Sequence, residues 1–112
     1  MTASQLTIQF QPGRAPGLQI SDLCVVCEEL ASDKASLVID RSDPEYVNFM
    51  FEANDLRALW KLIKQRLYGD GAISDFLRQS SIVVCEGTRG WDDYKLLHHF
   101  DPAQQLDEIP GN

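Results

Sequence analysis

The stretch NDLRALWKLIKQRLYG, residues 54–69, decides how the rest of the chain has to be arranged. Its apolar residues recur at intervals of three and four, which predicts an amphipathic helix. Asn54 or Asp55 is suited to cap the start of this helix, and Gly69 is suited to end it after Tyr68. The predicted buried stripe consists of Leu56, Leu59, Trp60, Ile63 and Leu67. Such a stripe has to be buried against another element, so we expect a sheet beneath it.

Strand-like segments lie on both sides of this helix. They cover residues 6–10, 36–41, 46–53, 81–86 and 94–100. A tight turn around Pro44 makes the second and third segments a hairpin, because proline presets one backbone dihedral angle. Glycines at 87 and 90 likewise make a hairpin of the last two segments. In the third segment, Val47, Phe49 and Phe51 are expected to face the core.

Two further helical patterns complete the order of elements. Residues 22–31 have helical apolar spacing with Ser21 as N-cap, although the β-branched Val25 and Val26 favour a strand. We interpret this segment as a short helix, and residues 73–79 as another. This order predicts one α+β domain over residues 1–102, followed by a mobile acidic C-terminal tail over residues 103–112. The expected architecture is a two-layer sandwich, in which a mainly antiparallel sheet of about five strands carries the helices on one face.

The composition is that of a globular domain with an acidic surface. The chain has 112 residues, of which 44% are hydrophobic, and a formal net charge of −7. This balance disfavours binding to nucleic acid or to an anionic membrane, and it permits a basic protein partner. Three cysteines argue against a disulfide framework, and residues 1–10 lack the basic start of a secretory signal. We therefore expect a cytoplasmic protein that is a monomer or a weak homodimer.

Cys24 and Cys27 have the spacing of a zinc-binding or redox-active pair. Cys85, His98 and His99 could supply further metal ligands. However, the two residues between these cysteines are valines and not the turn-forming residues of a zinc site. On a helix, both thiols would join the apolar side as small hydrophobic groups. His98 and His99 would point to opposite faces of a strand, so they could not bind one metal together. We therefore expect neither a metal nor a cofactor.

Cys85 with His98 or His99 is a second candidate, because a Cys–His dyad is the minimum for thiol catalysis. If Glu86 pairs with Tyr94 in the last hairpin, Cys85 lies opposite Lys95 and three residues along the strand from His98. Each residue advances about 3.4 Å, so the two side chains would be too far apart for contact. The motifs of phosphate-binding loops, zinc proteases, serine hydrolases and calcium loops are also absent from the sequence. We expect no catalytic residue.

The predicted helix at residues 54–69 differs in charge from the rest of the chain. Arg57, Lys61 and Lys64 line its polar face, whereas acids predominate elsewhere. These cations could bind an anion or RNA, but no aromatic residues or glycines are interleaved with them. We therefore interpret this row as a solvated helix face.

The tip of the last hairpin combines aromatic and acidic residues in the run Gly90-Trp91-Asp92-Asp93-Tyr94. Trp and Tyr are enriched in protein interfaces, because they supply a large contact area at low entropic cost. Adjacent carboxylates rarely converge on one atom, so acid–base catalysis by Asp92 and Asp93 is not expected. The simpler interpretation is that Trp91 folds back locally while Asp92 and Asp93 are solvated.

A compact, acidic α+β chain with this loop resembles the small acidic immunity proteins that neutralise bacterial toxins. The likeness lies in size, charge and organisation. It implies a non-catalytic cytoplasmic inhibitor that binds its cognate toxin at or near the active site. Acids on such an inhibitor would accelerate its association with a cationic cleft.

The expected partner is therefore a protein, a toxin domain with a basic surface, and neither a nucleic acid nor a membrane. The expected partner-binding residues are Trp91, Asp92, Asp93, Tyr94, Glu28, Glu29, Asp43 and Glu45. The alternative is a small cytoplasmic enzyme or regulatory subunit that uses Cys85, His98 or the Asp92–Asp93 pair.

Overall fold

Strands and helices follow one another along the chain in the order that the sequence predicts. The computed structural model describes residues 4–32, 35–86 and 94–107. Its elements are β1 (Ser4–Phe10), the 3-10 turn η1 (Pro12–Arg14), α1 (Ile20–Ala31), β2 (Ser36–Asp40), β3 (Val47–Ala53), α2 (Leu56–Leu67), α3 (Ala72–Arg78), β4 (Ser81–Glu86) and β5 (Tyr94–His98). Every predicted helix and strand is present, and no end is displaced by more than two residues.

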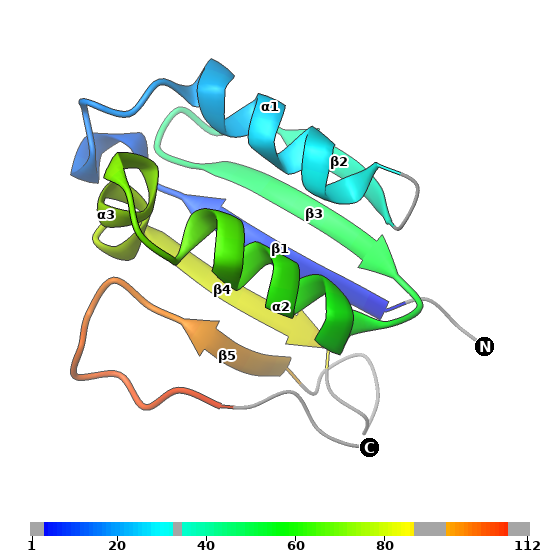
Figure 1. Ribbon diagram of the computed structural model, residues 1–112. Coiled ribbons are helices and arrows are strands. Elements are labelled where there is room, and N and C mark those ends of the chain that lie inside the picture. Colours follow the sequence, from blue (N-terminus) through cyan, green and yellow to red (C-terminus); the bar gives the residue numbers. More distant parts are fainter. Residues whose placement is uncertain (1–3, 33–34, 87–93, 108–112) are drawn as a thin grey trace.

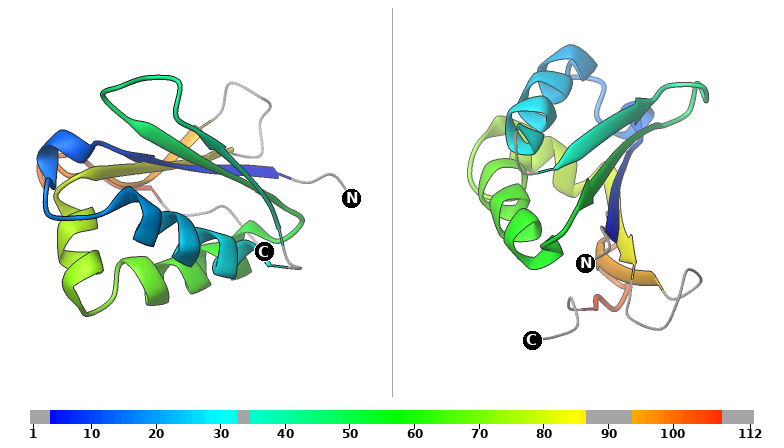
Figure 2. Two further views of the ribbon diagram at one scale, coloured as in Figure 1. Left: turned by 90° about the horizontal axis from the view of Figure 1, so that it is seen from above. Right: turned by 90° about the vertical axis from the view of Figure 1, so that its right-hand side faces the viewer.

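The strands form one antiparallel, five-stranded sheet in the order β2-β3-β1-β4-β5. Helices α1 and α2 lie side by side on one face of the sheet, with α3 at one end of the same layer (Figures 1 and 2). The predicted α+β two-layer sandwich is therefore confirmed. From β1 to β4 the order is that of a split βαβ unit, in which β3 lies between β1 and the parallel β2. Helix α3 extends the second crossover, and β5 extends the sheet.

The core lies between the sheet and the helices, and alternation along the strands builds it. The predicted inward orientation of Val47, Phe49 and Phe51 is confirmed, because all three side chains are buried. The buried residues of the three inner strands include Leu6, Ile8, Phe10, Val47, Phe49, Phe51, Val83 and Cys85.

Helix α1 begins two residues earlier than the sequence predicts, at Ile20. Its N-cap is Gln19 and not Ser21, and the Gln19 carbonyl accepts the first amide hydrogen bonds of the helix. Ile20 packs against the core, and this contact extends the helix toward its N-terminus. The helical interpretation is confirmed despite Val25 and Val26, since tertiary packing outweighs their weak preference for strands.

Helix α2 has the predicted N-cap, because the Asp55 side chain accepts a hydrogen bond from the Ala58 amide. The expected position of Trp60 in the buried stripe is only partly correct. Its side chain is part-buried at the edge of the stripe, with its ring 5.8 Å from that of Tyr68. The fully or nearly buried residues of the stripe are Leu56, Leu59, Ile63 and Leu67.

Strand β5 differs from the prediction, because it ends at His98, two residues early. It also contains a bulge: Val84 pairs with Leu96, but the next residue, Val83, pairs with His98. The extra residue is Leu97. A bulge of this kind leaves two neighbouring side chains on similar sides of the strand. Leu97 is accordingly buried, and the His98 ring packs against the ring of Tyr68.

The segment after β5 returns along the outer edge of that strand. The Asp107 amide donates to the Leu96 carbonyl at 2.7 Å, and the Leu96 amide donates to the Asp107 carboxylate at 2.9 Å. These bonds join residue 107, which lies within the predicted tail, to the outer edge of β5. Hydrogen-bonding groups on an edge strand are open to such pairing, which sequence periodicity does not reveal.

Candidate functional site

Most of the predicted hairpin tip cannot be placed, because Trp91, Asp92 and Asp93 lie outside the described residues. Tyr94, the first residue of β5, is 56% exposed. Its predicted pairing with Glu86 is confirmed. An exposed tyrosine at the end of a strand is available for contact with a partner.

The predicted acids on α1 and in the β2–β3 turn lie at two separate places. Glu28 and Glu29 are exposed in the last part of α1, where Glu29 forms a 2.9 Å ion pair with Arg66 of α2. Asp43 and Glu45 lie in the turn, and the Asp43 carboxylate accepts a hydrogen bond from the Glu45 amide. Helix α1 leads into the start of β2, and the β2–β3 turn follows the end of β2 (Figure 1). The length of β2 therefore separates Glu28 and Glu29 from Asp43 and Glu45. These acids do not form one surface with the start of β5, at the other edge of the sheet.

The thiols of α1 join its buried side, as predicted. Cys27 is fully buried, and this burial, with the neighbouring Cys24 and Glu28, raises the pKa of Cys27 to about 12. Burial also raises the pKa of Cys24, while Arg41 opposes that shift. Thiols with raised pKa values remain protonated at neutral pH and are poor nucleophiles. Within the described residues, no three His, Cys, Asp or Glu side chains come together as a metal site.

The proposed Cys85–His98 dyad is closer than predicted, but it is still separated along the strands. Cys85 pairs with Lys95, and His98 pairs with Val83, so the bulge reduces the offset from three residues to two. Two residues of a strand correspond to about 7 Å, which exceeds hydrogen-bonding reach.

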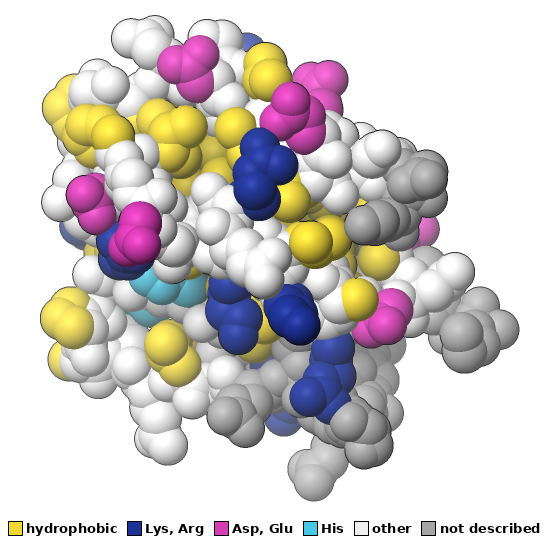
Figure 3. Space-filling view, in the orientation of Figure 1, with side chains coloured by type: hydrophobic (Ala, Val, Ile, Leu, Met, Phe, Trp, Pro, Cys, Tyr) yellow, Lys and Arg dark blue, Asp and Glu magenta, His cyan; other side chains and the backbone are white. Residues whose placement is uncertain are grey.

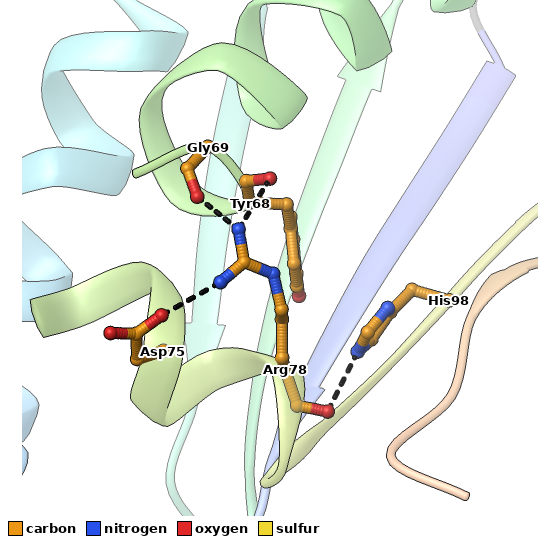
Figure 4. A network of polar contacts seen from close by, with 5 residues as sticks. All are labelled: Tyr68, Gly69, Asp75, Arg78 and His98. Atoms are coloured by element: carbon orange, nitrogen blue, oxygen red, sulfur yellow. Dashed lines mark hydrogen bonds and ion pairs between the residues drawn. The ribbon is translucent and has the colours of Figure 1, made fainter. Parts of the chain in front are cut away.

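His98 belongs instead to a polar network at the C-terminal end of α2 (Figure 4). Its ring lies 4.7 Å from the Tyr68 ring, and its Nε2 lies 3.1 Å from the Arg78 carbonyl oxygen. A carbonyl can only accept, so Nε2 carries a proton. The Arg78 guanidinium donates to the carbonyls of Tyr68 and Gly69 and pairs with Asp75. These contacts join α2, α3 and β5, so His98 serves to hold the layers together.

The face of the sheet that points away from the helices carries apolar side chains in a row that the sequence did not predict. The row crosses all five strands through directly paired residues, namely Val38, Met50, Thr7, Val84 and Leu96; Thr7, on the central strand, is polar and the other four are apolar. Val38, at one end, is 60% exposed. No described helix covers this face (Figure 2). A signal was present in the sequence, because Val38, Met50 and Val84 are apolar at positions that alternate with the core residues.

Carboxylates flank this row on both sides. Glu52 and Glu86 lie in the next row toward one end of the strands, and Asp40 lies in the next row toward the other. The Glu86 carboxylate also accepts a hydrogen bond from the Gln5 amide. Among the described strand residues this face carries neither Lys nor Arg, because Lys95 pairs with a residue of the inward face. We call the apolar row and these three acids the open face.

A hollow of about 800 Å³ lies on the opposite, helical side, between α2 and β5. In Figure 3, Lys and Arg side chains gather along the edge of α2 that is nearest β5. The described lining residues are Arg57, Ala58, Trp60, Lys61, Lys64, Leu97, Leu106 and Asp107. We call this hollow the basic groove. Its cations form a row that the sequence alone reveals, whereas the apolar Leu97 and Leu106 come from a distant part of the chain and join the groove only in the folded structure.

Comparison of the chain with protein-family models, curated proteins and solved structures gave no significant match. None of the helices in the described part of the chain has the length and apolar character needed to cross a membrane. The function therefore has to be argued from the surfaces of the molecule.

Proposed function

We propose that this protein is a non-catalytic protein-binding module, an immunity-type inhibitor that neutralises a bacterial toxin with a basic surface. The observation that carries the proposal is the open face. Within the described residues, the sheet has one face that the helices cover and one face that no helix covers, and the apolar side chains that cross the second face are what a partner can bury.

The charges of the open face support a basic partner. Glu52, Glu86 and Asp40 surround the apolar row, and the whole chain has a net charge of −7. Complementary charges steer diffusional encounter, and they can raise association rate constants to about 10⁸ M⁻¹s⁻¹ at low salt. Tyr94 adjoins this surface, because it pairs with Glu86. Of the predicted hairpin tip, Tyr94 is the residue that the structure describes, and it adds an exposed aromatic side chain beside Glu86.

Two exposed valines allow a matched crosslinking experiment. Val38 lies on the open face and is 60% exposed, whereas Val25 lies on α1 in the helical layer and is 57% exposed. A photoreactive amino acid is placed at one position or the other, and each protein is irradiated in lysate of the native cell. We expect an adduct with a basic protein domain at position 38 and no such adduct at position 25.

The partner identified in this way is then assayed for activity with and without the inhibitor. Val38→Asp should weaken inhibition, while Val25→Asp should leave it unchanged and serve as the control for folding. The proposal is wrong if both positions give the same adducts, if the adduct at position 38 is with an acidic protein, or if the partner remains active when bound.

A further inference from the structure

The basic groove combines positive charge with an apolar surface. Arg57, Lys61 and Lys64 occupy successive turns of α2 and extend over about 10 Å of the helix axis, since each residue rises about 1.5 Å. The part-buried Trp60 and the buried Leu97 lie beside them in the lining. A ligand in the groove would therefore meet cations and an apolar wall together.

Two of these cations, Lys61 and Lys64, take part in no ion pair within the described part of the chain. The ion pairs found within residues 4–32, 35–86 and 94–107 join Arg66 to Glu29 and Arg78 to Asp75, and neither involves Lys61 or Lys64. The Lys64 ammonium lies 5.7 Å from the centre of the Trp60 ring, so a charge and an aromatic surface are adjacent. This arrangement suits a ligand with a planar ring next to its negative groups.

The far side of the groove is formed by the segment that follows β5. Leu106 is 49% exposed there, and it adds a second apolar side chain across from Trp60. Asp107 is the acidic residue among the described lining residues, and its carboxylate accepts a hydrogen bond from the Leu96 amide, which fixes it at the rim. Those described residues therefore carry a positive balance, with three cations against one carboxylate.

We propose that the basic groove binds a nucleoside phosphate. The phosphates lie along Lys61 and Lys64, and the base lies against Trp60 and the leucine side chains. The volume of about 800 Å³ falls in the range of small-ligand pockets, roughly 300–1,000 Å³. Aromatic stacking accepts any base, because every base has a π face. The site lies on the helical side of the molecule, so it is separate from the open face and does not depend on the proposed inhibitor function.

Tryptophan fluorescence tests this inference directly. The chain has two tryptophans, so Trp91→Phe leaves Trp60 as the sole indole fluorophore. We expect saturable quenching of that protein by ATP. Adenosine, which lacks the phosphates, and tripolyphosphate, which lacks the base, should each bind at least about tenfold more weakly.

Charge variants of the Trp91→Phe protein supply the matched comparison. Lys61→Gln and Lys64→Gln should each weaken ATP binding about fivefold or more. Arg66→Gln removes the same charge from the same helix, but Arg66 pairs with Glu29 outside the groove, so ATP affinity should be unchanged. Circular dichroism spectra establish that each variant is folded.

The proposal is overturned if ATP gives no saturable quenching at millimolar concentration. It is equally overturned if adenosine binds as tightly as ATP, if Arg66→Gln weakens binding as much as Lys61→Gln, or if a glutamate-rich peptide binds where ATP does not. None of these results bears on crosslinking at Val38, so failure here is distinguishable from failure of the inhibitor function.

Discussion

Trp60 is the residue at which sequence and structure disagree most about the core. Its place at the edge of the stripe leaves part of the indole exposed, whereas Ile63 on the same helix is fully buried. Replacing a fully buried Trp by Ala costs about 3–5 kcal/mol, and we expect Trp60→Ala to cost less, about 2 kcal/mol. Ile63→Ala should cost at least as much, within the range of about 2–5 kcal/mol.

Urea denaturation of both variants measures these free energies of unfolding. Lys61→Ala, at an exposed position of the same helix, is the control and should change stability by no more than about 0.5 kcal/mol. A larger loss for Trp60→Ala than for Ile63→Ala would mean that the indole is buried in solution.

His98 gives the stability a pH dependence with a definite sign. Burial lowers the pKa of His98 below its ordinary value of 6.5, and the neighbouring His99 and Arg78 lower it further, while the bond to the Arg78 carbonyl opposes the shift. The unfolded chain therefore binds this proton more readily, so stability is highest above pH 6.5 and falls as the pH drops through the folded pKa.

Melting temperatures recorded between pH 7.5 and 5 test this dependence. We expect the decrease on acidification to be smaller for His98→Gln, because glutamine can donate to the Arg78 carbonyl without titrating. His99→Gln leaves the bonded imidazole in place and should retain most of the wild-type slope. Identical slopes for His98→Gln and the wild type would contradict the assignment.

Among the elements, β5 is the one whose details the sequence could not supply. The pairing of Glu86 with Tyr94 follows from alternation and the position of the turn. The bulge at Leu97 does not follow from these patterns. Whether a strand takes up an extra residue depends on which side chains it can bury, and here Leu97 is buried and His98 packs at the end of α2. The attachment of Asp107 to the edge of β5 could not be predicted either, because its hydrogen bonds produce no periodic pattern in the sequence.

The attachment of the tail to β5 can be measured at a single amide. Asp107→Ala removes the carboxylate that accepts from the Leu96 amide, and we expect hydrogen exchange at that amide to accelerate about tenfold. Global stability should change by no more than about 1 kcal/mol, the net value of one hydrogen bond. Gln105→Ala, at an exposed position of the same segment, should leave the exchange rate unaltered, and an unchanged rate in Asp107→Ala would show that the bond is absent in solution.

For the whole molecule, the fold was more predictable than the functional surfaces. Local patterns such as the stripe of α2 and the alternation of β3 determine each element, and these elements leave few ways to form two layers. A surface instead depends on which residues become neighbours across strands. Val38 and Leu96 occupy opposite edges of one row, and Trp60 and Leu106 face one hollow, although each pair is distant in sequence.

The central position of β1 has a consequence for synthesis of the protein. β1 is synthesised before the other strands of the sheet, yet it lies between β3 and β4, so one of its partners is available only after residues 81–86 have been made. Until then the backbone N–H and C=O groups along one edge of β1 have no strand to pair with. A nascent chain interrupted before β4 therefore leaves an unpaired strand edge open to other chains, and we expect such a chain to aggregate unless chaperones bind it.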